Sequence, residues 1–396
     1  MATKGLTAPE MGTVSARALE LCQQVGETPQ LFGALVGALT FYLIRAELQT
    51  ARELAERLMS LAQRAQDPAL LLDAHWSLAC VSYSLGEWIS ARAHCERAVA
   101  LYDPGQRHAA IGLVDSGVTT LTYLANVLWV LGYPDQARTR SRAGLTLAQE
   151  TAHPQTTALA WTFDTRLYQF LREARTVQQR AEALIMLCDE QGLVLSPWGI
   201  IPQGWALAMQ GQAEEGIKQI QQGMAALRAT GEELVRPYHL ARLAEAYGKA
   251  EQAEEGLTAL AEALATVNTT GERMYEAELY RLKGELTLQQ FMGHGSQLKV
   301  TNPQFPPSPS HTEAEACFQR AIEIARRQSA KSLELRAVMS LCRLWQQQGR
   351  KDEARQLLAD IYSWFTEGFD TKDLQEAKAL LEELSERGWC ENERSG

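Results

Sequence analysis

The side chains that most often bind metals or act as nucleophiles are scattered along this 396-residue chain. The seven cysteines form no Cys-x-x-Cys pair, which is typical of reduced thiols that fill small spaces in a core. The seven histidines form no His-Glu-x-x-His or His-x-x-His unit, so no compact zinc site is indicated. A site assembled from distant helices stays open, because metal geometry requires proximity in space only. We expect no metal and no cofactor.

The glycine pattern does not indicate phosphate chemistry. Gly293-His294-Gly295 is followed by no third glycine and preceded by no predicted strand, which is typical of a linker. The sequence contains neither a Gly-Lys-Ser/Thr loop nor a Gly-x-Ser-x-Gly elbow. Nucleotide-phosphate binding and serine-hydrolase chemistry are therefore not indicated.

The composition of the chain argues against some classes of binding partner. With 38 Lys and Arg against 48 Asp and Glu, the formal charge of −10 argues against nucleic acid, because we find no strongly basic face. No stretch approaches the length of an apolar membrane span, and residues 1–10 lack the layout of a secretory signal. The hydrophobic content of 46% is typical of a folded chain. We expect a soluble cytoplasmic protein that binds neither nucleic acid nor membrane.

A pattern of small residues recurs about every forty positions. It predicts the helices that hold the candidate binding residues in place. In the copy at Gly86, a glycine turn precedes Ala91, Cys95 and Ala98, and the first residue of this triplet recurs at 51, 91, 137, 177, 216, 256, 314 and 354. Apolar residues at helical spacing flank the glycine, so each unit is predicted to be two antiparallel helices, with small residues where they cross. One pair cannot bury its apolar face alone. Stacking about eight pairs predicts an all-α, right-handed superhelical solenoid with a concave groove.

These residues resemble the tetratricopeptide repeat. Its large-small pair in the first helix occurs as Leu78-Ala79, Leu124-Ala125, Leu243-Ala244 and Leu341-Cys342. A period near forty is similar to the long-helix variety in the sensor arms of bacterial signalling ATPases. Segments 233–249, 256–285 and 313–383 look like the tail of bacterial adenylate cyclase/AAA-ATPase signalling proteins.

The sequence also departs from that family. Its cyclase and ATPase portions are missing, so their activities do not carry over to this chain. Segments 107–117, 156–166 and 194–203 differ from the family pattern, and we hypothesise that they form a specialised ligand surface.

The resemblance implies which first-helix positions face the concave side. Tryptophan and tyrosine offer large contact areas, and arginine offers a two-pronged donor, so such residues commonly anchor recognition. By that count, the candidate groove residues are Asp73, Trp76, Tyr83, Asn126, Trp129, Thr162, Arg166, Gln169, Trp198, Trp205, Tyr238, Glu245, Arg281 and Glu285. For Trp129, Trp198 and Trp205, packing and binding both stay open. Trp88, Trp161 and Trp345 are expected in the core.

Three functions compete for this groove. The first is a scaffold that binds a peptide or partner domain, and it predicts that alanine at Asn126 and Arg166 abolishes capture without affecting folding. The second is a sensor arm in which Arg166 or Arg281 meets a small anionic or aromatic ligand. The third is an enzyme that uses Asp73, Arg166 and Glu245, which requires these side chains to converge in one enclosed pocket. We favour the scaffold over the other two.

The spacing of the units also predicts where the array is interrupted. Residues 1–290 are expected to hold units one to six and the first helix of unit seven. Residues 291–312 are expected to be a proline- and glycine-rich loop. Residues 313–390 are expected to complete unit seven and to add unit eight and a capping helix.

Overall fold

The computed structural model describes residues 29–103, 114–293 and 309–385, and every regular element in these ranges is an α-helix. Within these ranges, none of the helices combines the length and the apolar character needed to cross a lipid bilayer. The helices are α2 (Pro29–Ile44), α3 (Leu48–Ala65), α4 (Pro68–Ser84), α5 (Trp88–Leu101), α6 (Ser116–Val130), α7 (Pro134–Thr151), α8 (Pro154–Phe170), α9 (Ala174–Gln191), α10 (Pro197–Met209), α11 (Ala213–Ala229), α12 (Arg236–Lys249), α13 (Ala253–Thr270), α14 (Glu276–Gly293), α15 (Pro309–Arg327), α16 (Lys331–Gln347), α17 (Lys351–Tyr362) and α18 (Lys372–Ser385).

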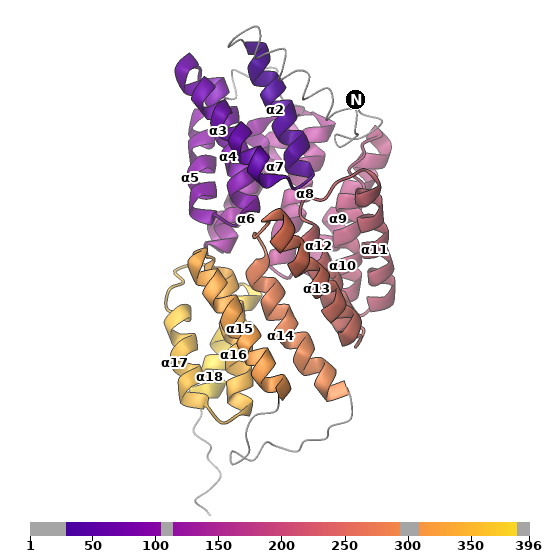
Figure 1. The fold of residues 1–396 in the computed structure, drawn as a ribbon, viewed down its shortest axis with the longest axis vertical. Helices are drawn as coiled ribbons and strands as arrows, with labels where there is room; N and C mark the ends of the chain where they lie inside the picture. The colour runs from indigo at the N-terminus through magenta and orange to yellow at the C-terminus, as the bar shows by residue number, and fades with distance from the viewer. Residues whose placement is uncertain (1–28, 104–113, 294–308, 386–396) are drawn as a thin grey trace, which may run out of the picture.

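The described helices form eight consecutive hairpins, from α2 with α3 to α16 with α17, and α18 packs after the last. The predicted all-α, right-handed superhelical solenoid is confirmed. Each small-residue triplet lies in the second helix of its pair, and its first residue is buried in all eight copies. The chain winds from α2–α5, through α8–α13, to α14–α18 at the opposite end of the long axis (Figure 1).

The small residues allow helices to cross with their backbones almost in contact. At the crossing of α10 and α11, a Cβ added at Gly216 would lie 2.3 Å from the Gly204 carbonyl oxygen. The reciprocal atom at Gly204 would lie 2.6 Å from the Gly216 carbonyl oxygen. Such distances are shorter than any van der Waals contact, so only glycine permits this crossing.

The superhelix is wound tightly enough for distant units to touch. The backbone amides of Glu233 and Leu234, just before α12, donate to the Ile44 carbonyl at the end of α2, at 3.0 and 2.9 Å. One unit further along, Arg273 and Met274 donate to the Ser84 carbonyl at 2.9 and 3.2 Å.

The same contact recurs in the following unit. The Ser332 hydroxyl at the start of α16 donates to the Trp129 carbonyl at 2.5 Å. Thus the end of a first helix meets the start of the first helix five units later. We call this set of contacts the inter-turn seam.

The segment before α18 continues the seam. Glu367 accepts hydrogen bonds from the amides of Asp135 and Gln136 in the first turn of α7, both at 3.0 Å. Arg138 on the same helix pairs with Asp370 at 2.9 Å. A carboxylate at a helix N-terminus satisfies amides that have no partner within the helix. The C-terminal units are thereby fixed to the middle of the chain.

The range predicted as a loop overlaps two helices at its ends. Helix α14 continues to Gly293 and α15 begins at Pro309, so both ends of the range 291–312 are helical. Residues 294–308, with most of the Gly-His-Gly sequence, lie outside the described residues. The division of the chain into three segments stays a prediction. The five cysteines within the described ranges are free and buried, as expected for core thiols.

Candidate functional site

Most of the predicted groove residues are buried where the first helices of different turns meet, and we call this region the inner wall. Side chains from facing turns fill it, because the inter-turn seam brings the first helices together. The residues exposed by no more than 4% are Tyr83, Asn126, Trp129, Arg166, Gln169, Trp205 and Tyr238. Thr162 and Arg281 are also buried, whereas Asp73, Trp76, Trp198, Glu245 and Glu285 are half-buried. The predicted concave groove is thus lined by buried aromatic and charged side chains, and the binding roles stay predictions.

Arg166 is enclosed by aromatic rings. Its guanidinium carbon lies 5.4 Å from the ring centre of Tyr238, 5.5 Å from that of Phe163 and 5.7 Å from that of Trp198. Its Nη1 donates to the Tyr83 hydroxyl at 3.4 Å. Ring faces attract a cation, but they do not neutralise its charge. Within the described ranges, no carboxylate forms an ion pair with this guanidinium.

Glu272 is a buried acid near Arg166. Burial raises the pKa of Glu272 to about 8, against the opposing effects of the Val235 amide and of Arg166. One carboxyl oxygen of Glu272 accepts the Val235 amide at 3.0 Å, and the other has no hydrogen-bond partner. Glu272 is therefore mostly protonated at neutral pH, so the positive charge of Arg166 is left without a counter-charge.

A second buried arginine adjoins the first through Tyr238. The Arg242 guanidinium carbon lies 5.1 Å from the centre of the Tyr238 ring, and its Nη1 pairs with Glu245 at 2.7 Å. The indole nitrogen of Trp205 donates to the same Glu245 oxygen at 2.8 Å. Tyr238 itself donates to Gln169 at 2.8 Å. This arginine, unlike Arg166, has a carboxylate partner.

Two further arginines complete the inner wall. Arg281 donates to both oxygens of Glu278, at 2.7 and 2.9 Å. Arg336 pairs with Asp373 at 2.8 Å and lies 4.8 Å from the ring centre of Trp129. Burial alone would raise the pKa of Glu278, but Arg281 and Arg336 lower it to about 2. This cluster is charge-paired and structural in character.

Asp73 and Trp76 contact other parts of the fold. Asp73 accepts from the Ser116 hydroxyl at 2.6 Å, and Trp76 packs edge-on against Tyr123 with ring centres 5.0 Å apart. Arg166 contacts Tyr238, and Glu245 pairs with Arg242, which contacts the same ring. A catalytic use of Asp73, Arg166 and Glu245 stays a prediction. Trp88 is in the core as expected, whereas Trp161 and Trp345 are only half-buried.

Asn126 has a structural function that the sequence did not indicate. Its amide nitrogen donates to the carbonyls of Thr122 and Phe163, both at 3.0 Å, and so joins α6 to α8. Contrary to the expectation of intact folding, Asn126→Ala should lower the free energy of unfolding by about 1–3 kcal/mol, since two buried hydrogen bonds are lost. Urea denaturation measures this change. An unchanged midpoint would show that these hydrogen bonds contribute nothing to stability.

Several buried charged residues were missed by the sequence analysis. Arg336 stands in the same position relative to Ala354, the first triplet residue of its unit, as Tyr238 does relative to Gly256. The count that selected Tyr238 could therefore also have selected Arg336. Arg242 lies one helical turn from Tyr238, on the same face. Glu272 precedes its helix in a turn, and no pattern indicated its burial.

Comparisons with known proteins extend the description of the fold. No family model matches the chain, and neither does any curated protein. Among solved structures, a Rap protein complexed with Competence and Sporulation Factor superposes with a TM-score of 0.59 at 10% identity, covering 96% of each chain. The chain therefore has a tetratricopeptide-like helical-repeat fold.

Two further solved structures superpose less closely. A signal transduction ATPase with a tetratricopeptide repeat sensor from Pyrococcus horikoshii gives a TM-score of 0.43 at 14% identity, over 96% of this chain and 55% of that one. The human IFIT1 dimer with m7Gppp-AAAA gives 0.48 at 14% identity, over 96% and 77%. The resemblance to a cyclase and ATPase arm stays a prediction, and the exclusion of nucleic acid gains no support.

Proposed function

We propose that this chain is a protein-interaction scaffold whose inner wall binds a peptide or partner domain through an acidic group that reaches Arg166. The observation that supports this proposal is the uncompensated charge of Arg166. A carboxylate from an acidic side chain or a chain terminus would pair with the guanidinium through two parallel hydrogen bonds. In keeping with the resemblance to sensor arms, we place this scaffold in cytoplasmic bacterial signalling.

Other polar groups on the inner wall favour a polar chain as the occupant. The side-chain oxygen of Asn126 and the side-chain nitrogen of Gln169 are buried without hydrogen-bond partners. A buried polar group without a partner costs free energy, and a peptide backbone offers both donors and acceptors. Such a peptide would satisfy groups that the closed wall leaves unpaired.

Access to Arg166 requires the turns of the superhelix to separate. The amides bonded to the Ile44 and Ser84 carbonyls can exchange those bonds for bonds to water when the seam opens. A ligand shifts the molecule towards the open form only by as much as it prefers that form. The bidentate pair with Arg166 supplies this preference, because it exists only when a ligand is bound.

Peptides that carry a carboxylate provide the test. An array of acidic peptides and their amide counterparts is screened, and the dissociation constants of the best binders are measured by fluorescence anisotropy. Arg166→Gln should weaken binding of acidic peptides at least about tenfold, because a charge-assisted pair is lost. Arg166→Lys should retain part of the affinity, since it keeps the charge but not the planar donor.

The control is Arg92→Gln on the outer face, where Arg92 pairs with the exposed Glu96 at 2.8 Å. Circular dichroism establishes that each variant is folded. Equal affinities for the Arg166→Gln and Arg92→Gln variants, or equal binding of acidic peptides and their amides, would contradict the proposal.

A further inference from the structure

A separate cavity lies between the fifth and sixth units. It has a volume of about 260 Å³ and opens between α11, α12 and α13. Its apolar lining includes Met224, Leu227, Leu240 and Leu243, and none of the predicted groove residues lines it. Its volume lies near the lower end of the range for small-molecule sites, so it suits a compact ligand.

One histidine in the lining, His239, lacks a hydrogen-bond partner. His239 is 4% exposed, and both of its ring nitrogens are buried without a hydrogen bond. Burial, together with the nearby charges of Arg166 and Arg242, lowers the pKa of His239 to about 3. The ring is therefore neutral at physiological pH and offers one donor and one acceptor. A buried imidazole with neither used is uncommon and is better explained by a ligand group.

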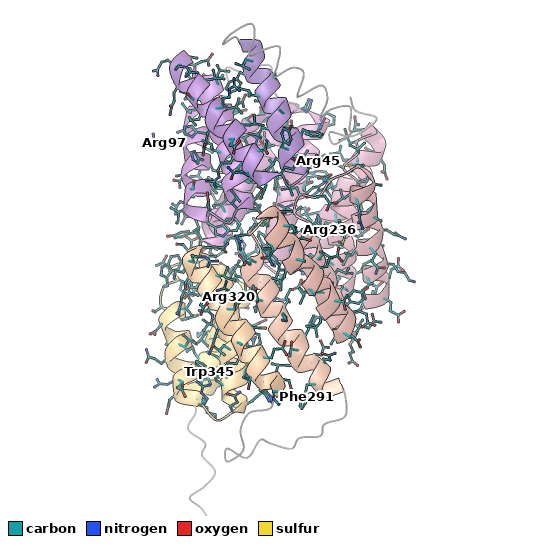
Figure 2. The ribbon with its side chains drawn as sticks, in the orientation of Figure 1. Arg45, Arg97, Arg236, Phe291, Arg320 and Trp345 are labelled. Carbon is teal, nitrogen blue, oxygen red and sulfur yellow. The ribbon has the colours of Figure 1, made fainter. Side chains whose placement is uncertain are left out.

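The mouth of the cavity carries two arginines and two glutamates. Arg236, labelled in Figure 2, is paired with Glu233 and with Glu262. Arg228 also lines the cavity and is exposed, and within the described ranges it forms no ion pair. Burial raises the pKa of Glu232 to about 7, so at neutral pH this acid only partly offsets the arginines. The charge of Arg228 is left available to an anion.

We propose that this cavity binds a small carboxylic acid with an apolar ring or chain and a hydroxyl or keto group. The carboxylate pairs with Arg228 at the mouth, and the apolar part packs on Met224, Leu240 and Leu243. The hydroxyl or keto oxygen bonds to His239. The ligand would contact side chains other than Arg166. His239 packs against Trp198 and Tyr238, which also surround Arg166, so the two sites are neighbours.

Calorimetric titration with phenyllactate, phenylpropionate and phenyllactamide tests the proposal. Phenyllactate should bind the full chain, and its amide should bind at least about tenfold more weakly, because it lacks the charge that meets Arg228. Arg228→Gln should reduce this preference, whereas Lys218→Gln on the same helix should not. Phenyllactate should also bind more tightly than phenylpropionate, and His239→Leu should abolish that difference.

A pair of tryptophan variants tests the location. Ala225 is exposed and lines the cavity, whereas its exposed neighbour Ala226 does not. Ala225→Trp should fill the cavity and eliminate binding, and Ala226→Trp should leave it unchanged. The proposal fails if none of the acids binds, if acid and amide bind equally, or if both tryptophan variants bind like the original protein.

Discussion

Replacing Glu278 by glutamine should lower the free energy of unfolding by about 3 kcal/mol at pH 7. The substitution keeps the shape of the side chain but leaves Arg281 and Arg336 facing a neutral group in the interior. The cost lies at the lower end for a broken buried ion pair, because Arg281 keeps Glu285 at 2.5 Å and Arg336 keeps Asp373. Guanidinium denaturation followed by circular dichroism measures it.

The same carboxylate should make the fold sensitive to acid. The pKa of Glu278 is depressed from 4.5 to about 2, so its contribution to stability is complete above pH 4.5 and is lost as the pH falls towards 2. The glutamine variant should lack this part of the pH dependence. The exposed Glu353, which pairs with Arg350 at 2.8 Å, provides the control, and its replacement by glutamine should have little effect. Similar losses for both variants would argue against a special contribution from the buried cluster.

Gly216→Ala should lower the free energy of unfolding by about 2–3 kcal/mol, although alanine normally favours a helix. The added methyl group would collide with the Gly204 carbonyl oxygen, 2.3 Å away, and with the Ala208 side chain. Because the opposing atom belongs to the backbone, α10 and α11 have to move apart. Thermal and urea unfolding of the variant measure the loss.

The matched control is Gly37→Ala within α2, where the added Cβ would have no neighbour within 4 Å. This change should raise stability by about 0.5–1 kcal/mol, because alanine loses less backbone entropy in a helix. If Gly216→Ala and Gly37→Ala shift the unfolding midpoint in the same direction, the close crossing of α10 and α11 does not require glycine at position 216.

The sequence predicted local structure well because local spacing determines it. The triplet at Ala91, Cys95 and Ala98 indicated a close crossing of helices, and all three side chains are buried. The start of α4 at Pro68, after the capping residue Asp67, also follows from local sequence. Asp67 accepts from the Ala69 amide at 2.8 Å, and proline at the first helical position needs no hydrogen-bond donor.

The closed inner wall could not be predicted in the same way. The register of Tyr83, Arg166 and Tyr238 indicates which face of each helix they occupy, but not what lies opposite. That depends on the pitch of the superhelix, which accumulates from small rotations between successive units. Arg166 and Tyr83 are 83 residues apart in sequence and meet only because of this winding.

The inter-turn seam changes how this array should come apart. In an open solenoid each unit touches only its neighbours, so the ends fray independently and stability is close to a sum of local terms. Here Ile44 relies on Glu233 and Leu234, and Arg172 on Asp373, so losing one end of the chain removes hydrogen-bond or ion-pair partners from its middle. We therefore expect the whole array to unfold as one cooperative domain, and not repeat by repeat.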